Sequence, residues 1–310
     1  MACVSNLEFF LHLNGRIHGS FIGYRGLQQG DPLSPLLFML AMEYFSRIMQ
    51  KACTHPNFNF HPYCKKLNLS HLMFADDLLL FSRANVPTIH IIKDALKSFS
   101  QCVGLEANLH KSHLFLGRCY LELHSQCLQA VGFQEDTLPM KYLGIPITAS
   151  GLTKLECSAL VEKITARVHI WATRNLSFAR RALLINDIIF GMFNYWASIF
   201  LLPKTILEKI TSICKNYLWG GTEDHTKVPH ISWANTCKAK KHGGLGLKDC
   251  EAWNKVIITK LVWAIGTKKD VLWVKWVHCR YIKDKDWWDF VPAPDSSWTW
   301  KKICSTKDIF

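Results

Sequence analysis

Residues 72–81, Leu-Met-Phe-Ala-Asp-Asp-Leu-Leu-Leu-Phe, place two adjacent acids between two short apolar runs. Apolar runs of this length predict buried β-strands, with Asp76 and Asp77 at the turn of a hairpin between them. Such a turn would hold both carboxylates at one exposed end of a rigid element. An Asp-Asp pair without further context is more typical of a solvated turn. Buried strands on both sides favour a second interpretation, in which a metal ion compensates the charge.

Paired carboxylates are what a two-metal phosphoryl-transfer site needs. Mg²⁺ prefers hard oxygen ligands and is bound through one or two carboxylates together with substrate phosphates. In such a site one cation lowers the pKa of an attacking 3′-hydroxyl, and the other stabilises the leaving pyrophosphate. The sequence therefore predicts that Asp76 and Asp77 are catalytic residues and that they bind Mg²⁺ in an active protein.

The stretch before the acid pair predicts a hairpin and then a helix. Residues 8–27 hold apolar runs broken by Asn14-Gly15, a signal for a type I′ turn. Residues 28–35, Gln-Gln-Gly-Asp-Pro-Leu-Ser-Pro, come directly before an apolar stretch with helical spacing. Ser34 is a candidate N-cap there, and Pro35 suits the first helical turn.

After the acid pair the pattern predicts a helix at residues 89–104 and then a loop that leads into a strand at residues 105–116. Lys111 lies inside that loop-to-strand segment. Residues 141–147 predict a short strand with a Gly-Pro interruption.

From about residue 152 the pattern changes to amphipathic helices, expected at residues 152–176, 178–202 and 205–221. The second is apolar enough to imitate a membrane span. Asp187 argues against that, because a charge at the centre of a membrane helix costs about 2.5–3.5 kcal/mol. A buried helix or helical pair is favoured instead. Pro203 should end or interrupt it.

The remaining residues, 222–310, are rich in Lys and Trp. Lysines can bind phosphates and tryptophans can stack on bases, each stacked base contributing about 1–3 kcal/mol. Several of the tryptophans nevertheless fall largely at helical intervals, which favours packing in a core. This spacing is clearest at Trp253, Trp263, Trp273 and Trp276.

The amino-acid composition limits which kinds of partner and cellular setting are expected. The chain has 310 residues, of which 49% are hydrophobic, so it can bury a sizeable core. Its formal charge of +13 favours a polyanionic partner such as nucleic acid, although many basic proteins bind none. Twelve scattered cysteines without a CxxC pair, and no secretory signal at the N-terminus, favour a reducing intracellular setting in the nucleus or cytoplasm. No complete set of zinc ligands is visible.

Several motifs together resemble the palm motifs of reverse transcriptases from LINE-type, non-LTR retrotransposons. They occur in that family's order, at residues 29–35, 74–77, 104–112 and 142–146. The resemblance continues more weakly through residues 217–221 and 241–247, which look like the thumb and downstream region of plant LINE polyproteins. It covers nearly all of the chain.

The resemblance implies an α+β fold. Residues 1–150 would form a partial right-hand palm, an antiparallel sheet with helices, followed by a helical thumb at 151–221 and a basic, Trp-rich helical extension at 222–310. The implied activity is RNA-directed DNA polymerisation by two-metal nucleotidyl transfer. Its partners would be an RNA template, a DNA primer and dNTPs, with no membrane.

Residue roles follow from the same resemblance. Asp76 would be the principal metal ligand and Asp77 a weaker one. Lys111 would lie near the pyrophosphate, although it could equally be a solvated lysine. Gln29 and Gly30 would line the pocket for the incoming nucleotide.

Tyr142, Leu143 and Gly144 match a primer grip, a hairpin that positions the primer 3′ end, although the same stretch could be an edge strand. Asp31 and Ser34 are better explained as residues that start the following helix.

Two departures from the family pattern matter. Gln28 stands where the family has a basic residue. Reverse transcriptases also carry another metal-binding Asp on an upstream palm strand, whereas residues 1–28 contain no aspartate, and the basic fingers are missing too. We therefore expect a truncated fragment that is inactive alone. The alternative is a non-catalytic remnant that binds nucleic acid.

Overall fold

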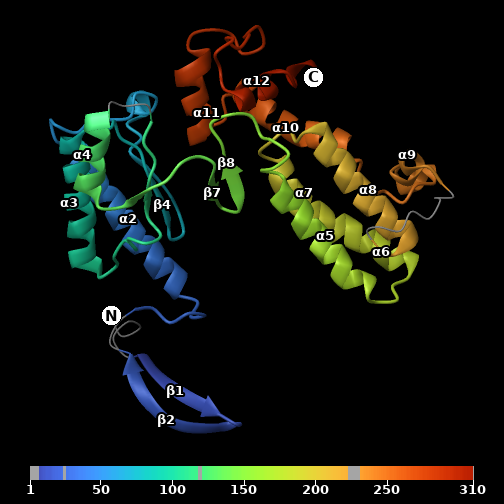
Figure 1. Ribbon diagram of the computed structural model, residues 1–310, viewed down its shortest axis with the longest axis horizontal. Coiled ribbons are helices and arrows are strands. Elements are labelled where there is room, and N and C mark those ends of the chain that lie inside the picture. Colours follow the sequence, from blue (N-terminus) through green and yellow to red (C-terminus); the bar gives the residue numbers. More distant parts are fainter. Residues whose placement is uncertain (1–6, 24–25, 118–120, 223–230, 310) are drawn as a thin grey trace. The chain divides into compact units, whose positions relative to one another are not determined.

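Helices and small two-stranded sheets make up the chain in the computed structural model, which describes residues 7–23, 26–117, 121–222 and 231–309 (Figure 1). The chain divides into two units, Met1–Asp136 and Thr137–Phe310. Strands and helices alternate in the first, and the second is helical after one short hairpin. The predicted mixture of helices and small antiparallel sheets is confirmed, while the division into palm, thumb and extension stays a prediction. Parts of the predicted segments, at residues 24–25 and 223–230, lie outside the described residues.

The first hairpin forms as its turn sequence predicts. Strands β1 (Leu7–Leu13) and β2 (Arg16–Gly23) pair antiparallel. Asn14 and Gly15 have φ of 49° and 79°, so both turn residues adopt the left-handed conformation of a type I′ turn.

Helix α2 (Ser34–Ala52) begins differently from the prediction. Leu33 occupies the N-cap position, so the assignment of Ser34 as N-cap is wrong by one residue. The Ser34 hydroxyl instead donates to the carbonyl of Gln28 at 2.7 Å, and Asp31 Oδ1 accepts from the Leu33 N–H at 2.8 Å. The carboxylate of Asp31 thus satisfies an N–H at the helix start, and the serine hydroxyl closes the preceding loop.

The remaining elements of the first unit are short, apart from two helices. They are the 3₁₀ turn η1 (Lys65–Leu67), β3 (His71–Phe74), β4 (Asp77–Leu80), α3 (Val86–Val103), β5 (His113–Leu114), α4 (Leu121–Val131) and β6 (Gln134–Glu135). Strands β3 and β4 pair antiparallel, whereas β5 and β6 form a short parallel pair. Helix α3 ends at Gly104, whose φ of 76° gives it a left-handed C-cap.

The second unit opens with the hairpin β7 (Met140–Tyr142) and β8 (Ile145–Ile147). Its helices follow as α5 (Ser158–Ala172), α6 (Phe178–Leu184), the π-helical segment η2 (Ile185–Ile189), α7 (Phe190–Ala197) and α8 (Lys204–Gly220). One large core holds them together and includes Ile164, Ile189, Phe193, Ile210 and Leu218.

The apolar helix predicted over residues 178–202 is an interrupted one. A π turn separates α6 from α7, and the helix ends at Ala197, well before Pro203. Pro203 instead occupies the N-cap position of α8, where its missing N–H costs nothing. Helix α8 ends at Gly221 with φ of 85°, which confirms the predicted glycine C-cap. Within the described ranges, every helix is too short or too polar to span a lipid bilayer.

One long helix, α10, and several short helical elements complete the described part of the unit. They are α9 (Trp233–Thr236), the 3₁₀ turn η3 (Lys240–His242), α10 (Cys250–Gly266), α11 (Leu272–Val277), the π segment η4 (His278–Ile282), α12 (Trp298–Cys304) and the 3₁₀ turn η5 (Lys307–Ile309). A second core packs α10 against α12 through residues that include Val262, Ile265 and Trp300.

The tryptophans of this region are mainly core residues, but not the ones that the spacing singled out. Trp253 and Trp276 are partly buried against the two cores, as predicted. Trp263 and Trp273 are exposed, which contradicts the prediction. The most deeply buried members lie elsewhere, at Trp233, Trp287 and Trp300. Helical spacing indicates that residues share a face, and only the packing decides whether that face is covered.

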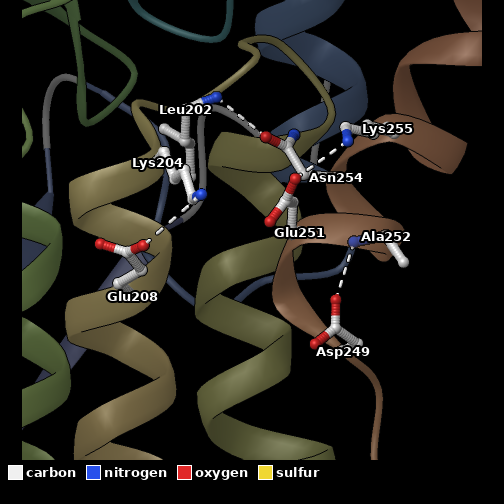
Figure 2. Close-up of polar contacts among 8 residues, drawn as sticks. All are labelled: Leu202, Lys204, Glu208, Asp249, Glu251, Ala252, Asn254 and Lys255. Carbon is white, nitrogen blue, oxygen red and sulfur yellow. Dashed lines mark hydrogen bonds and ion pairs between the residues drawn. The ribbon is translucent and has the colours of Figure 1, made fainter. Parts of the chain in front are cut away.

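The amide of Asn254 holds together the turn between α7 and α8 (Figure 2). This buried side chain accepts from the Leu202 N–H at 2.8 Å and donates to the carbonyls of Ala197 and Phe200 at 3.0 and 2.8 Å. The neighbouring Trp253 indole donates to Asn194 Oδ1 at 2.7 Å. Since a buried backbone group without a partner is costly, Asn254 is what allows this turn to be buried.

We predict that Asn254→Ala lowers the free energy of unfolding by about 2–4 kcal/mol, because three backbone groups lose their partner in bonds that are buried or partly buried. Denaturant unfolding followed by circular dichroism measures the change. Asn235→Ala, at an exposed position of α9, is the matched control and should leave stability within about 0.5 kcal/mol of the parent. Equal stability of the two variants would contradict the prediction.

Candidate active site

The acid pair lies at the tip of the β3–β4 hairpin. Phe74 pairs with Asp77, so the turn consists of Ala75 and Asp76. Ala75 has φ of 50°, the left-handed conformation that a two-residue hairpin turn demands of its first residue. Both carboxylates are exposed, so the predicted position at the open end of a hairpin is confirmed.

The strands that carry the pair are only half covered, which corrects the expectation of buried strands. On one face, Met73 and Leu78 pack against the core between α2 and α3 that includes Phe45 and Phe99. The register Leu72↔Leu79 and Phe74↔Asp77 puts these four residues on the other face. Leu72 is 37% exposed and Phe74 58%. The described helices thus cover one face, and Asp77 lies on the open one.

His71 fastens the hairpin to the middle of α2. Its Nε2 lies 3.1 Å from Ser46 Oγ on α2, and its Nδ1 lies 2.9 Å from Ser70 Oγ. The imidazole also meets the ring of Phe45 edge-on, with 5.9 Å between centroids. Burial lowers the pKa of His71 below its usual value. A neutral imidazole can donate at one nitrogen and accept at the other, which suits a link between two hydroxyls.

Gln29 and Gly30 lie in the loop before α2, and both are exposed. Gly30 has φ of 95°, a conformation that residues with a side chain adopt only with strain. Within the described chain neither residue makes a hydrogen bond or ion pair with Asp76 or Asp77. Their predicted role at the nucleotide pocket stays a prediction.

Lys111 lies in the turn before β5, as predicted. Its backbone N–H donates to Asn108 Oδ1 at 3.2 Å, which shapes the turn. Its side chain is exposed. The structure thus places Lys111 on a loop of the first unit, and its role beside a pyrophosphate stays a prediction.

The three residues that were predicted to grip the primer form the tip of the β7–β8 hairpin in the second unit. Tyr142 ends β7, and Leu143 and Gly144 have φ of 49° and 82°, so they make a type I′ turn rather than part of an edge strand alone. The Tyr195 hydroxyl on α7 donates to the Leu143 carbonyl at 2.5 Å. Tyr195 was not among the predicted residues, because no local sequence signal links residues 52 positions apart.

The acid pair provides part of a metal site. Two adjacent carboxylates fit the way Mg²⁺ is usually held, through one or two carboxylates with water and substrate phosphates. Across the described residues, however, no group of three or more His, Cys, Asp or Glu side chains gathers at a point where it could hold a metal. The residues therefore fit one weakly held cation better than a complete two-metal site.

Comparisons with known proteins concern both units. Residues 2–147 match the family described as reverse transcriptase (RNA-dependent DNA polymerase). A putative ribonuclease H protein of Arabidopsis thaliana is 29% identical over 163 residues, which are 51% of this chain and 26% of that protein.

Two retrotransposon proteins are similar over longer stretches. The retrovirus-related Pol polyprotein from a type-2 retrotransposable element of Drosophila melanogaster is 25% identical over 236 residues, 73% of this chain and 21% of that protein. The corresponding polyprotein from a type-1 element of Nasonia vitripennis is 24% identical over 290 residues, 85% of this chain and 26% of that protein. The chain thus spans about a quarter of the length of these relatives.

We predict that His71 makes stability depend on pH. Because its pKa is lowered in the folded state, the unfolded chain takes up the proton first as pH falls. The contribution of His71 is therefore complete above its unfolded pKa of about 6.5 and is lost as pH falls through that value toward the lowered folded pKa. Thermal unfolding at about pH 7.5 and about pH 5.5 measures the loss.

In this experiment the melting temperature of His71→Gln should fall less than that of the parent when the pH is lowered from the higher to the lower value. His90→Gln, at an exposed position of α3, is the control and should keep the parental dependence. A parental dependence in His71→Gln as well would show that His71 is not the responsible group.

Proposed function

We propose that this chain is the palm and thumb portion of the RNA-directed DNA polymerase of a plant-type, LINE-like retrotransposon, because residues 2–147 match the reverse transcriptase family and the similar proteins include retrotransposon polyproteins. The observation that supports this most is the pair Asp76 and Asp77, held at the exposed tip of an anchored hairpin inside the matched segment. An apolar hairpin that presents two carboxylates suits binding of a cation together with a phosphate.

The proposed organisation follows the secondary structure. Residues 1–150 would be a partial palm, because they contain the small sheets, and residues 151–221 a thumb, because they contain long packed helices. Residues 222–310 would be a helical extension. The proposed partners are an RNA template, a DNA primer and dNTPs inside the cell, in keeping with the net charge of +13.

In this proposal Asp76 and Asp77 hold Mg²⁺. The bound cation would lower the pKa of the primer 3′-hydroxyl and neutralise charge on the phosphates. The Lys111 ammonium would stabilise negative charge on the leaving pyrophosphate. Gly30, which has no side chain, would let the nucleotide approach the backbone beside Gln29.

The β7–β8 turn would position the primer. The carbonyl of Leu143 is held by the hydroxyl of Tyr195, so the turn at Leu143 and Gly144 is fixed with respect to α7. A fixed turn is what alignment of a 3′-hydroxyl requires, since small displacements of reacting groups lower rates strongly.

We further propose that these 310 residues alone have little or no polymerase activity. Two-metal catalysis needs more ligands than Asp76 and Asp77, and no third one gathers with them among the described residues. Residues 1–28 hold one acid, Glu8, whose carboxylate accepts from Ser20 Oγ across β1 and β2 at 2.6 Å. Loss of a carboxylate from a metal site lowers metal affinity and removes most of the transition-state stabilisation.

A second candidate function is nucleic-acid binding without catalysis. It is favoured by the segment Lys238–Lys248, which contains four lysines and no acid. Binding of this kind needs neither metal nor a complete palm, and it depends strongly on salt.

Primer extension on an RNA template with Mg²⁺ tests the proposal. It compares the 310-residue chain, its Asp76→Ala variant and a longer version whose N-terminus carries an added palm strand with an aspartate. We expect extension products from the longer version only. Asp76→Ala in that longer version should abolish them, with a loss of at least about 100-fold.

One control variant and two further outcomes make the test specific. Asp94→Ala, in α3, removes a carboxylate far along the chain from the hairpin and should leave the longer version active. Activity in the short chain that disappears with Asp76→Ala would support the polymerase and overturn the proposed inactivity. No activity in any version, with all of them folded, would favour the binding function.

A further inference from the structure

A pocket opens in the second unit between α6, α8, α9 and the loop at residues 243–245. Its volume is about 270 Å³. It is lined by aromatic, polar and glycine residues, namely Phe178, Trp219, Ile231, Asn235, Thr236, Gly243, Gly244 and Leu245. None of these side chains is charged. The pocket belongs to a different unit from the acid pair at Asp76 and Asp77.

The loop at residues 243–245 forms one wall of the pocket, and its backbone conformation requires glycine at two positions. Gly243 has φ of 80°, and a Cβ on Gly244 would lie 2.0 Å from the carbonyl oxygen of Lys238. Two hydrogen bonds hold the loop against the end of α9 and the segment after it. The Leu245 N–H donates to the Thr236 carbonyl and the Gly246 N–H to the Lys238 carbonyl, both at 2.9 Å. The wall is therefore backbone, which a flat ligand can approach closely.

Aromatic rings form another part of the lining. Phe178 begins α6 and Trp219 lies near the end of α8, with ring centroids 5.0 Å apart. Trp219 packs against the main core of the unit, whereas Phe178 remains 39% exposed. The phenyl ring is thus a supported apolar surface that solvent still reaches. Such surfaces stack on nucleobases in single-strand binding proteins.

Asn235 offers hydrogen bonds at the edge of the pocket. Its backbone is engaged in α9, where its N–H donates to the Ser232 hydroxyl at 3.3 Å. Its side-chain amide makes no hydrogen bond to any described residue, and the residue is exposed. An amide presents one acceptor and two donors, a pattern that matches the edge of adenine.

Cationic residues adjoin two parts of the lining of this uncharged pocket. Lys238, Lys240 and Lys241 are exposed and come immediately before the glycine loop. Along the chain the next acid is Asp249, beyond the loop. On the aromatic side, the guanidinium of Arg181 donates to the carbonyls of Leu176 and Leu218, next to Trp219. The pocket therefore suits an anionic ligand that has an uncharged flat part. The flat part would enter the uncharged lining, and the negative charge would lie near the lysines.

We propose that this pocket binds one unpaired base of a single-stranded nucleic acid, adenine by preference. The base stacks on Phe178, the amide of Asn235 contacts its edge, and Lys238, Lys240 and Lys241 bind the adjoining phosphates. At about 270 Å³ the pocket is below the range of about 300–1,000 Å³ that holds drug-sized ligands, which suits a single ring system. The proposal rests on nucleic-acid binding by this chain but not on its catalysis.

Fluorescence anisotropy with the full chain tests this site. The probes are a labelled oligoadenylate of about eight nucleotides and an abasic strand of the same length and charge. EDTA is present throughout, so the metal site cannot contribute. We expect the oligoadenylate to bind more tightly than the abasic strand. Phe178→Ala should weaken oligoadenylate binding roughly 5- to 150-fold while leaving the abasic strand unaffected. Asn235→Ala should act in the same direction.

A matched pair of triple variants separates the lysines from net charge. K238Q/K240Q/K241Q should weaken both probes and lower the slope of log affinity against log salt by about 2, as expected for three phosphates on a single strand. K268Q/K269Q/K285Q removes the same charge at exposed positions elsewhere and should change that slope much less.

Two results would overturn the proposal. One is equal affinity for the oligoadenylate and the abasic strand. The other is parental affinity in both Phe178→Ala and Asn235→Ala, provided that circular dichroism shows them folded. Asp76→Ala should bind as the parent does, so failure of the polymerase proposal leaves this test intact.

Discussion

Burial of one face of the β3–β4 hairpin fixes the position of the acid pair. Two strands of four residues are not stable alone in water, so the hairpin depends on the core between α2 and α3. His71 adds a directional link through Ser46. Asp76 and Asp77 therefore owe their place to the apolar residues that pack the hairpin against α2 and α3. The same arrangement leaves Leu72 and Phe74 exposed on the other face.

In the second unit, the main constraint is the burial of backbone polar groups in the turn between α7 and α8. The turn after α7 has polar groups that would be costly to bury, and the amide of Asn254 satisfies three of them. With that turn in place, α7 presents Tyr195 to the β7–β8 hairpin. One buried amide thus contributes to the order of a turn that the proposed function uses.

Local chemistry explains which predictions succeeded. Asn14, Gly15 and Gly221 adopt the left-handed backbone conformation readily, so the first hairpin turn and the end of α8 follow from residue type. The prediction of buried strands at residues 72–81 was wrong because apolarity shows what should be covered, not whether a partner is present. Ser34 was misassigned because its hydroxyl donates to the Gln28 carbonyl and does not cap the helix. Sequence spacing does not show which of two nearby backbone partners a serine hydroxyl will bind.

By itself, the sequence determined the elements whose causes lie within a few residues: the turns, the caps and the acid pair at a hairpin tip. Tertiary structure alone decided which faces were covered, why the helix at residues 178–202 contains a π turn, and which tryptophans are buried. It also brought Phe178, Trp219 and Asn235 to one pocket. The physical reason is the distance along the chain over which each kind of interaction acts. Backbone preferences act between neighbours, whereas burial depends on residues that are distant in the chain and that spacing does not identify.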